Sequence, residues 1–236
     1  MSAVSTERPP MDPAVAAYVA DSYPNNADYV VAEGALRPRR KLRARLRRIL
    51  PLYAEPRDEL LDLSSSKGYF VLEAAARPGC ERALGIDVHE RDVEAARAVA
   101  AHLGLAKARF ELLGLRELAA RIDDFGGPFR TVLLLNTYPY LYFGSDRGPA
   151  VASDHDELFR LLARVTGERL LFSNRVDFDV LQRHMQARAR AAGLEGGYDR
   201  RSIRAAAERH FEVEVQRPLR FRWFQRLPLW VLRPRR

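Results

Sequence analysis

Cysteine is almost absent from this sequence, with Cys80 alone among 236 residues. A single cysteine excludes an internal disulfide and favours a reducing compartment, the cytoplasm. Long apolar runs are missing too, and none approaches the roughly 20 residues that cross a bilayer as a helix. The N-terminal residues MSAVSTERPPMDP lack the basic start and apolar run of a signal peptide. We therefore expect a cytoplasmic protein without integral membrane association.

Lysine is also scarce, with three residues against 36 arginines. The net charge of +8 is concentrated in two stretches without acidic residues: residues 36–50 hold eight basic residues, and residues 217–236 hold seven arginines. The remainder of the chain is therefore acidic overall. Local arginine clusters are typical of phosphate and nucleic-acid binding. A GC-rich coding bias gives the same excess of arginine, and the composition does not separate the two interpretations.

The order of apolar runs predicts an α/β fold. Strand-like runs alternate with amphipathic segments, which is typical of a mostly parallel sheet with right-handed crossovers. The predicted strands cover residues 59–63, 82–87, 108–113, 130–136, 169–173, 211–216 and 229–232. The predicted helices of this region cover residues 68–77, 90–103, 116–122, 153–165, 178–192 and 201–209.

Residues before this alternation predict an N-terminal tail and a helical cap over residues 1–56, leaving residues 57–236 as the core. A short helix is expected over residues 13–20. Between residues 39 and 53, Leu42, Leu46 and Ile49 share one helical face, and arginines occupy the others. Pro51 is expected to bend or end that helix.

The stretch from Glu59 to Asp87 is the most informative. It predicts a strand, a polar loop of pattern D-x-S-x-S-x-G from Asp62 to Gly68 (the motif loop), a helix, and a second strand that ends at Asp87. Strand, loop and helix together bring backbone N–H groups to a polar ligand. A carboxylate 19 residues after Gly68 can accept hydrogen bonds from ribose hydroxyls. A nicotinamide fingerprint would instead read G-x-G-x-x-G.

This loop resembles motif I of the class I S-adenosylmethionine-dependent methyltransferases, an acidic residue followed by G-x-G-x-G. Asp62 stands at the acidic position, Ser64 and Ser66 at the first two glycines, and Gly68 at the third. The closing helix, strand and strand are similar as well, so the resemblance covers about 180 residues and is strongest to small bacterial members. It implies a Rossmann-like class I fold: a seven-stranded, mostly parallel sheet with a C-terminal antiparallel hairpin.

The two serines depart from the motif. Glycine permits positive φ and close backbone approach, whereas serine adopts positive φ only with strain. Either the loop keeps negative φ at Ser64 and Ser66, or the pocket is altered. An ordinary strand-to-helix connection, with Ser66 capping the helix, is the alternative.

The resemblance implies S-adenosyl-L-methionine as the cofactor and assigns residues to it. The residues that would hold the methionine end are Asp62, Ser64, Ser66 and Gly68. Asp87 would bind the ribose with Val88 beside the adenine, and Leu113, Gly114 and Leu115 would line the adenine site. Asn136 would face the methionine portion and the acceptor.

Methyl transfer depends mainly on alignment in a dry site, so no catalytic triad is required. The aromatic segment 136–144 follows the fourth strand, where the family reaches its acceptor. Asn136, Tyr138 and His184 are weak catalytic candidates. Ser153 is expected to cap the helix that contains His155. No histidine has a second His or Cys at ligand spacing, so no metal site is predicted.

Three functional hypotheses follow. The leading one is a methyltransferase that moves a methyl group by direct displacement to an O or N atom of a small molecule. The second is a tRNA or rRNA methyltransferase that uses the basic segments 36–50 and 217–236. The third is a non-catalytic methyltransferase-like binding module.

Overall fold

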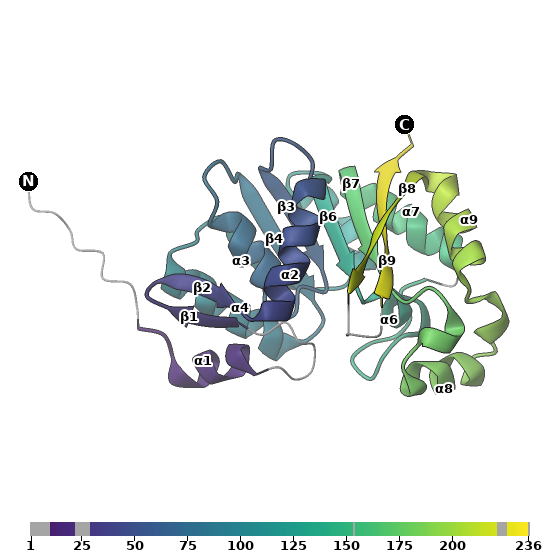
Figure 1. The fold of residues 1–236 in the computed structure, drawn as a ribbon, viewed down its shortest axis with the longest axis horizontal. Helices are drawn as coiled ribbons and strands as arrows, with labels where there is room; N and C mark the ends of the chain where they lie inside the picture. The colour runs from purple at the N-terminus through teal and green to yellow at the C-terminus, as the bar shows by residue number, and fades with distance from the viewer. Residues whose placement is uncertain (1–9, 22–28, 153, 221–225, 236) are drawn as a thin grey trace, which may run out of the picture.

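The structure, a computed structural model, describes residues 10–21, 29–152, 154–220 and 226–235. Its centre is a seven-stranded sheet in the order β5-β4-β3-β6-β7-β9-β8 (Figure 1). The strands of this sheet are β3 (Glu59–Leu63), β4 (Arg82–Asp87), β5 (Ala108–Leu112), β6 (Phe129–Leu135), β7 (Thr166–Ser173), β8 (Phe211–Arg220) and β9 (Arg226–Pro234). The five strands from β3 to β7 pair in parallel, and β9 runs antiparallel to both β7 and β8. This is the sheet that the sequence predicts.

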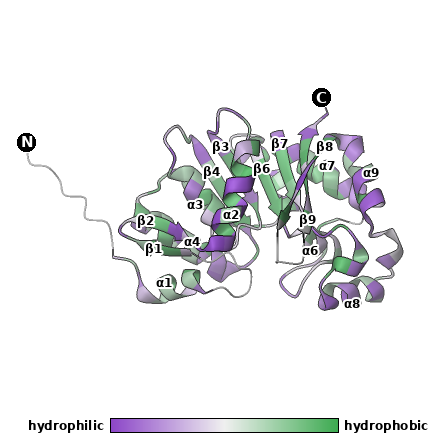
Figure 2. Cartoon of the chain, viewed as in Figure 1, coloured by the Kyte–Doolittle hydropathy of each residue, from purple (hydrophilic) through white to green (hydrophobic). Residues whose placement is uncertain are grey.

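Helices cover both faces of the sheet. Successive residues of a strand point to opposite faces, so Leu60 and Leu61 belong to two different cores. One core contains residues of α1 (Pro13–Ala20), α2 (Arg40–Ile49), α3 (Tyr69–Ala75) and α4 (Glu90–Leu103). The other contains residues of α5 (Leu115–Ala120), α6 (Tyr138–Phe143), α7 (His155–Val165), α8 (Arg183–Ala191) and α9 (Arg200–His210). Hydrophobic residues gather on the central strands, and α2 is mostly hydrophilic on its outer side (Figure 2).

The N-terminal segment contains a β-hairpin that the sequence prediction missed. β1 (Tyr29–Ala32) pairs antiparallel with β2 (Ala35–Pro38), and α1, β1 and β2 lie together at one end of the molecule (Figure 1). Glu33 and Gly34 form the turn with φ of 52° and 69°, the two positive values that a tight hairpin turn requires. α2 ends at Ile49, and Pro51 lies in the short 3-10 helix Leu50–Leu52 that follows, as expected.

Other boundaries also differ from the prediction. The segment 178–192 is not one helix: a 3-10 turn, Phe178–Val180, precedes α8. Asp154 caps α7, because its side chain accepts a hydrogen bond from the Glu157 N–H. The predicted cap, Ser153, lies outside the described residues. The aromatic segment predicted as a loop forms the short helix α6. Within the described ranges, no helix is long and apolar enough to cross a membrane.

Candidate functional site

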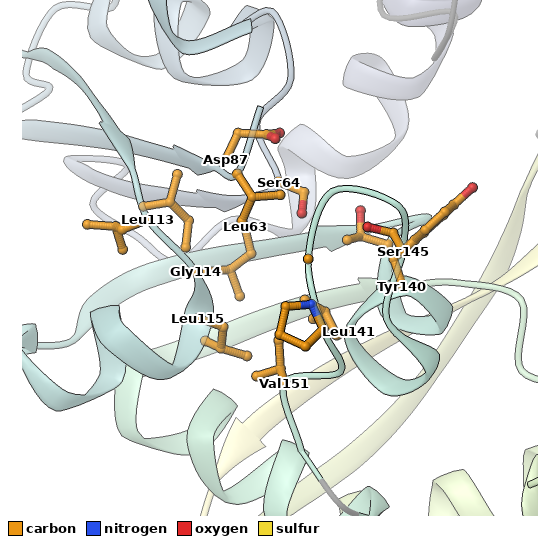
Figure 3. Close-up of a pocket in the computed structure, with 15 residues that line it drawn as sticks. Leu63, Ser64, Asp87, Leu113, Gly114, Leu115, Tyr140, Leu141, Ser145 and Val151 are labelled. Atoms are coloured by element: carbon orange, nitrogen blue, oxygen red, sulfur yellow. The ribbon is translucent and has the colours of Figure 1, made fainter. Parts of the chain in front are cut away.

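A pocket opens at the carboxyl ends of β3, β4 and β6, beside the end of β5 (Figure 3). The empty space of this pocket, counted out into the open solvent at its mouth, is about 520 Å³. Sequence-predicted residues form one wall: Ser64, Asp87, Val88, Leu113, Gly114 and Leu115. Leu63 of the motif loop and Thr137, Tyr140 and Leu141 of the aromatic segment also line it, as members of segments that the sequence placed at the site. The remaining lining residues were not predicted: Ile86, Ser145, Gly148, Pro149 and Val151.

Asp87 is the acidic group of the pocket. Its Oδ2 accepts a hydrogen bond from the Ser66 N–H at 2.8 Å, and its Oδ1 accepts one from the His89 N–H at 3.0 Å. Burial raises the pKa of Asp87, and these two bonds oppose the rise. A carboxylate has about four lone-pair positions, so two remain for a ligand. Asp87 thus fixes the motif loop and still offers acceptors to the pocket.

The backbone of the motif loop adopts the conformation of glycine at both serines. Ser64 has φ of 67° and Ser66 has φ of 49°, so the alternative in which both serines keep negative φ is wrong. Left-handed backbone costs a non-glycine residue about 1–2 kcal/mol. Ser66 does not cap the helix, because α3 begins at Tyr69 with Gly68 as its N-cap residue. The loop therefore holds two serines in left-handed backbone at the expense of strain, and such strain clusters at functional sites.

Gly68 is the one motif glycine that the chain retains, and packing requires it. Its φ is 80°, and a Cβ there would lie 2.7 Å from the Ala96 Cβ and from the Phe110 ring. Any larger residue would therefore meet α4 and β5 at once, in addition to the strain of a positive φ. This double constraint explains why glycine remains at the third position of the motif.

Asp62 lies beneath the loop and does not line the pocket. It is 4% exposed. Burial, together with the nearby Asp87 carboxylate, raises the pKa of Asp62 to about 8, and Arg45 of α2 opposes the rise. The N-terminal segment thus brings a cation close to the acidic position of the motif.

Two further segments of the N-terminal cap contact the loop. The Lys67 ammonium donates to the Asp21 carbonyl at 2.7 Å and lies 4.7 Å from the centre of the Tyr18 ring. The Tyr29 hydroxyl donates to the Lys67 carbonyl at 2.7 Å. Lys67 is only 2% exposed, so its charge is held inside the contact between loop and cap.

Asn136 follows β6 in left-handed conformation, with φ of 64°, and does not belong to the described residues that line the pocket. Its Oδ1 accepts a hydrogen bond from the buried Arg175 guanidinium. The neighbouring Asn174 binds the same turn, because its Oδ1 accepts from the N–H groups of Thr137 and Tyr138 at 2.7 and 2.9 Å. The ends of β6 and β7 are therefore fixed to each other beside the pocket.

Tyr138, a catalytic candidate from the sequence, is placed in the core and not on the pocket wall. It is fully buried, and its hydroxyl bonds to His155 Nδ1 at 2.8 Å. His155 Nε2 lies 3.1 Å from the Gly197 carbonyl, so Nε2 carries the proton and Nδ1 accepts from Tyr138. Burial lowers the pKa of His155, which fits this neutral, structural role.

Tyr140 is the tyrosine that lines the pocket. Its hydroxyl accepts a hydrogen bond from Gln182 Nε2 at 3.3 Å and lies 3.5 Å from His184 Nε2. His184, the third catalytic candidate, is thereby brought next to the outer wall of the pocket, away from Asp87. The sequence placed Tyr140 near the site as a member of the aromatic segment, whereas nothing in the sequence predicted that Gln182 would contact it.

The segment from Gly144 to Val151 forms the rest of the outer wall, and two ion pairs hold it. The Arg147 guanidinium lies 3.8 Å from Asp92 Oδ2 on α4, and Asp146 pairs with Arg188 on α8. Asp92 is fully buried and also accepts a hydrogen bond from the Tyr18 hydroxyl at 2.7 Å. The outer wall and the N-terminal cap thus meet at one carboxylate.

The pocket combines one carboxylate with apolar walls. Asp87 supplies the carboxylate. Val88, although apolar, is 50% exposed at the pocket, so a flat ring can cover it. The remaining walls near it are apolar: Leu113, Leu115, Leu141 and Val151. A Cβ added at Gly114 would meet no atom within 4 Å, so there is open space over the pocket floor.

Solved structures that resemble this chain include a methyltransferase and a domain solved with SAH. No protein-family model and no curated protein sequence matches the chain. The bifunctional kinase-methyltransferase WbdD is 18% identical, with a TM-score of 0.54, over 73% of this chain and 34% of WbdD. EvdMO1 is 24% identical, with a TM-score of 0.54, over 82% of this chain and 40% of EvdMO1. The N-terminal domain of EvdMO1, solved in the presence of SAH and D-fucose, is 21% identical, with a TM-score of 0.55, over 83% of this chain and 84% of that one.

These likenesses establish the fold. The chain has the Rossmann-like sheet of these methyltransferase structures, which confirms the fold class that the sequence predicts. The chain spans about a third of WbdD and two fifths of EvdMO1.

Proposed function

We propose that the chain is an S-adenosylmethionine-dependent methyltransferase that transfers a methyl group to an oxygen of a small, sugar-like acceptor. The observation that supports it most is the motif loop. Ser64 and Ser66 keep the left-handed backbone of the missing glycines, and the Ser66 N–H is bonded to Asp87. A chain with no ligand to bind at this loop gains nothing from that strain.

The residues around the pocket have distinct roles under this proposal. Asp87 binds the ribose, and Val88, Leu113 and Leu115 enclose the adenine. Ser64, Ser66, Gly68 and Asp62 shape the site of the methionine end, and Asn136 borders the reacting methyl group.

When bound, the cofactor supplies an electrophilic methyl carbon on a sulfonium. The protein holds the acceptor in line with it and excludes water, and alignment of this kind accounts for much of the barrier reduction in enzymes. The apolar walls and the Gly144–Val151 segment exclude water from the pocket. The sugar-like acceptor is proposed because the N-terminal domain of EvdMO1 was solved in the presence of D-fucose.

Calorimetry with S-adenosylmethionine and with SAH tests the proposal. We expect saturable one-to-one binding to the purified chain, and methyl transfer from radiolabelled cofactor to at least one member of a panel of sugars. Absence of cofactor binding would contradict the proposal and favour a non-catalytic module. Binding of cofactor with transfer only to RNA would favour the RNA methyltransferase hypothesis, whose basis is the two basic segments 36–50 and 217–236.

A further inference from the structure

The segment from Gly144 to Val151 contains a turn that lines the pocket and begins at a hinge-like residue. Ser145, which lines the pocket from this turn (Figure 3), is bonded to Gly148 through backbone hydrogen bonds of 2.8 and 3.3 Å. The turn is therefore one unit. Gly144 lies between α6 and the turn with φ of 74° and ψ of −177°, a backbone region open almost to glycine alone. Hinges are commonly residues at the end of an element, so Gly144 is placed to let the turn move as a body.

Two ion pairs join this turn to other elements, and one of them reaches the wall that carries the pocket carboxylate. The pair of Asp146 with Arg188 contributes little, because Asp146 is 96% exposed. The other pair joins Arg147 to Asp92 on α4, whose side chain is only 1% exposed. α4 follows directly after β4, which ends at Asp87. Burial raises the pKa of Asp87, and the Arg147 charge is among the causes that oppose the rise, so the guanidinium lies near both walls.

The contact between Arg147 and Asp92 is incomplete. Arg147 Nη1 lies 3.8 Å from Asp92 Oδ2, which is about 1 Å longer than a charge-assisted hydrogen bond. Asp92 Oδ1 accepts from the Tyr18 hydroxyl, whereas Oδ2 is buried without a hydrogen bond, although His89 Nδ1 lies 3.0 Å away. A buried carboxylate oxygen without a hydrogen bond is unfavourable. A small inward movement of the turn would therefore be stabilised by a new bond from Arg147.

We propose that the segment from Gly144 to Val151 is a lid over the pocket, and that Arg147 closes it by bonding to Asp92 when a ligand fills the pocket. The inference rests on the proposed function, because the ligand is the cofactor or its product SAH. A ligand between Asp87 and Ser145 gains contacts with the lid as the lid closes, and such a difference in contacts shifts an equilibrium between two states. Arg147 is a positioning residue, since it acts through Asp92. It slows the release of SAH, a step that limits turnover in many enzymes.

The first test measures how long SAH stays bound. Arg147→Met removes the charge and keeps an apolar side chain. The dissociation rate of SAH, measured by surface plasmon resonance, should rise about tenfold, which corresponds to the loss of one hydrogen bond to a charged group. The association rate should change much less, because SAH enters through the open lid in both proteins.

Arg204→Met is the matched control for the first test. Arg204 on α9 is as exposed as Arg147, 45% against 42%, and it also forms an ion pair, with Glu208 at 2.7 Å. Its loss should leave the dissociation rate of SAH at the value of the unaltered protein. An equal rate in the Arg147→Met and Arg204→Met variants would overturn the role of Arg147 and leave the proposed function intact.

The second test asks whether Arg147 acts through Asp92 or contacts SAH itself. Asp92→Asn removes the charge and keeps an oxygen that can accept from the Tyr18 hydroxyl, and it should speed the release of SAH as Arg147→Met does. If the pair is what closes the lid, the double variant releases SAH no faster than either single variant. Effects that multiply would overturn the inference, because Arg147 would then hold SAH without Asp92. Thermal unfolding checks that Asp92→Asn is folded, and the first and third tests do not depend on it.

The third test needs no ligand, so it separates this inference from the proposed function. Ala150 is exposed and the native Cys80 is buried, so a nitroxide attached at Ala150→Cys reports the mobility of the lid. In the ligand-free protein, Arg147→Met should make the label more mobile, and SAH should make it less mobile where Arg147 is intact. If SAH does not bind, the proposed function fails, and the label still decides whether Arg147 restrains the segment. A label equally mobile with and without Arg147 would show that the segment is a fixed wall.

Discussion

The Ser66 N–H donates to Asp87 Oδ2 at 2.8 Å, so the loop after β3 is tied to the end of β4. The left-handed backbone at Ser66 points this N–H toward the carboxylate. One acidic side chain therefore serves the loop and the pocket at once.

Asp87→Asn should weaken SAH binding by about 10- to 100-fold, because a hydrogen bond to a charged group contributes about 1.5–3 kcal/mol. In this variant the side-chain NH₂ group faces the N–H of either Ser66 or His89, and two donors cannot form a hydrogen bond. The free energy of unfolding should therefore fall as well. Calorimetry and urea unfolding measure the two effects. Asp123→Asn, an exposed site on the surface, is the control. Equal SAH affinity in both variants would contradict the role of Asp87.

Ser64→Gly should stabilise the chain. The strain of a left-handed serine is about 1–2 kcal/mol, whereas the extra freedom of glycine in the unfolded chain costs about 0.5–1 kcal/mol. We expect a net gain of about 0.5–1 kcal/mol in the free energy of unfolding, measured from urea midpoints at constant m. Ser64→Ala keeps the Cβ and the strain, so it should give no gain. A glycine variant less stable than the alanine variant would show that Ser64 is not strained.

Asp62 should make stability depend on pH. Its pKa in the folded protein, about 8, lies above the ordinary value of 3.8, so the folded state holds the proton more tightly. The contribution of Asp62 to the free energy of unfolding is therefore greatest below about pH 4, where the carboxyl is protonated in both states. This contribution falls as the pH rises from about 4 toward 8, because only the unfolded chain then releases the proton. Asp62→Asn should flatten that slope in unfolding experiments across the range. Asp87 contributes a slope of the same sign, so some slope should remain. A slope identical to that of the unaltered protein would exclude Asp62 as its source.

Lys67→Met should loosen the N-terminal cap, because the ammonium bonded to the Asp21 carbonyl joins α1 to the motif loop. Loss of a charged hydrogen bond of about 1.5 kcal/mol corresponds to roughly tenfold more frequent opening. Hydrogen exchange of the amides of α1 measures it. Lys41→Met, on the exposed side of α2, should leave that exchange unchanged. Unaltered exchange in Lys67→Met would show that other contacts alone hold α1.

The sequence was sufficient for features set by local pattern. β3 and β4 begin and end at the predicted residues, because their apolar runs are bounded by polar loops. α4 begins and ends at the residues predicted for it, Glu90 and Leu103. Asp87, Val88 and Gly114 reach the pocket because parallel strands bring their carboxyl ends to one edge of the sheet.

Features that depend on distant contacts were beyond the sequence. The β1–β2 turn uses Glu33 and Gly34, which is not one of the usual hairpin pairs. The backbone at Ser64 was undecided, because only its surroundings fix the sign of φ. The sequence pattern does not distinguish the environment of Tyr138 from that of Tyr140. The packing of α6 against His155 and α8 decides that Tyr138 is buried and Tyr140 faces the pocket.

The position of β9 has a consequence for how the protein is made. β9 lies between β7 and β8, although it follows both in the chain. Until the ribosome has released β9, the edge of β7 has no partner, and an open edge strand can pair with another chain. The strands that carry the pocket, β3 to β6, are all synthesised earlier. A nascent chain can thus complete the strands around the pocket while its sheet is still open to aggregation.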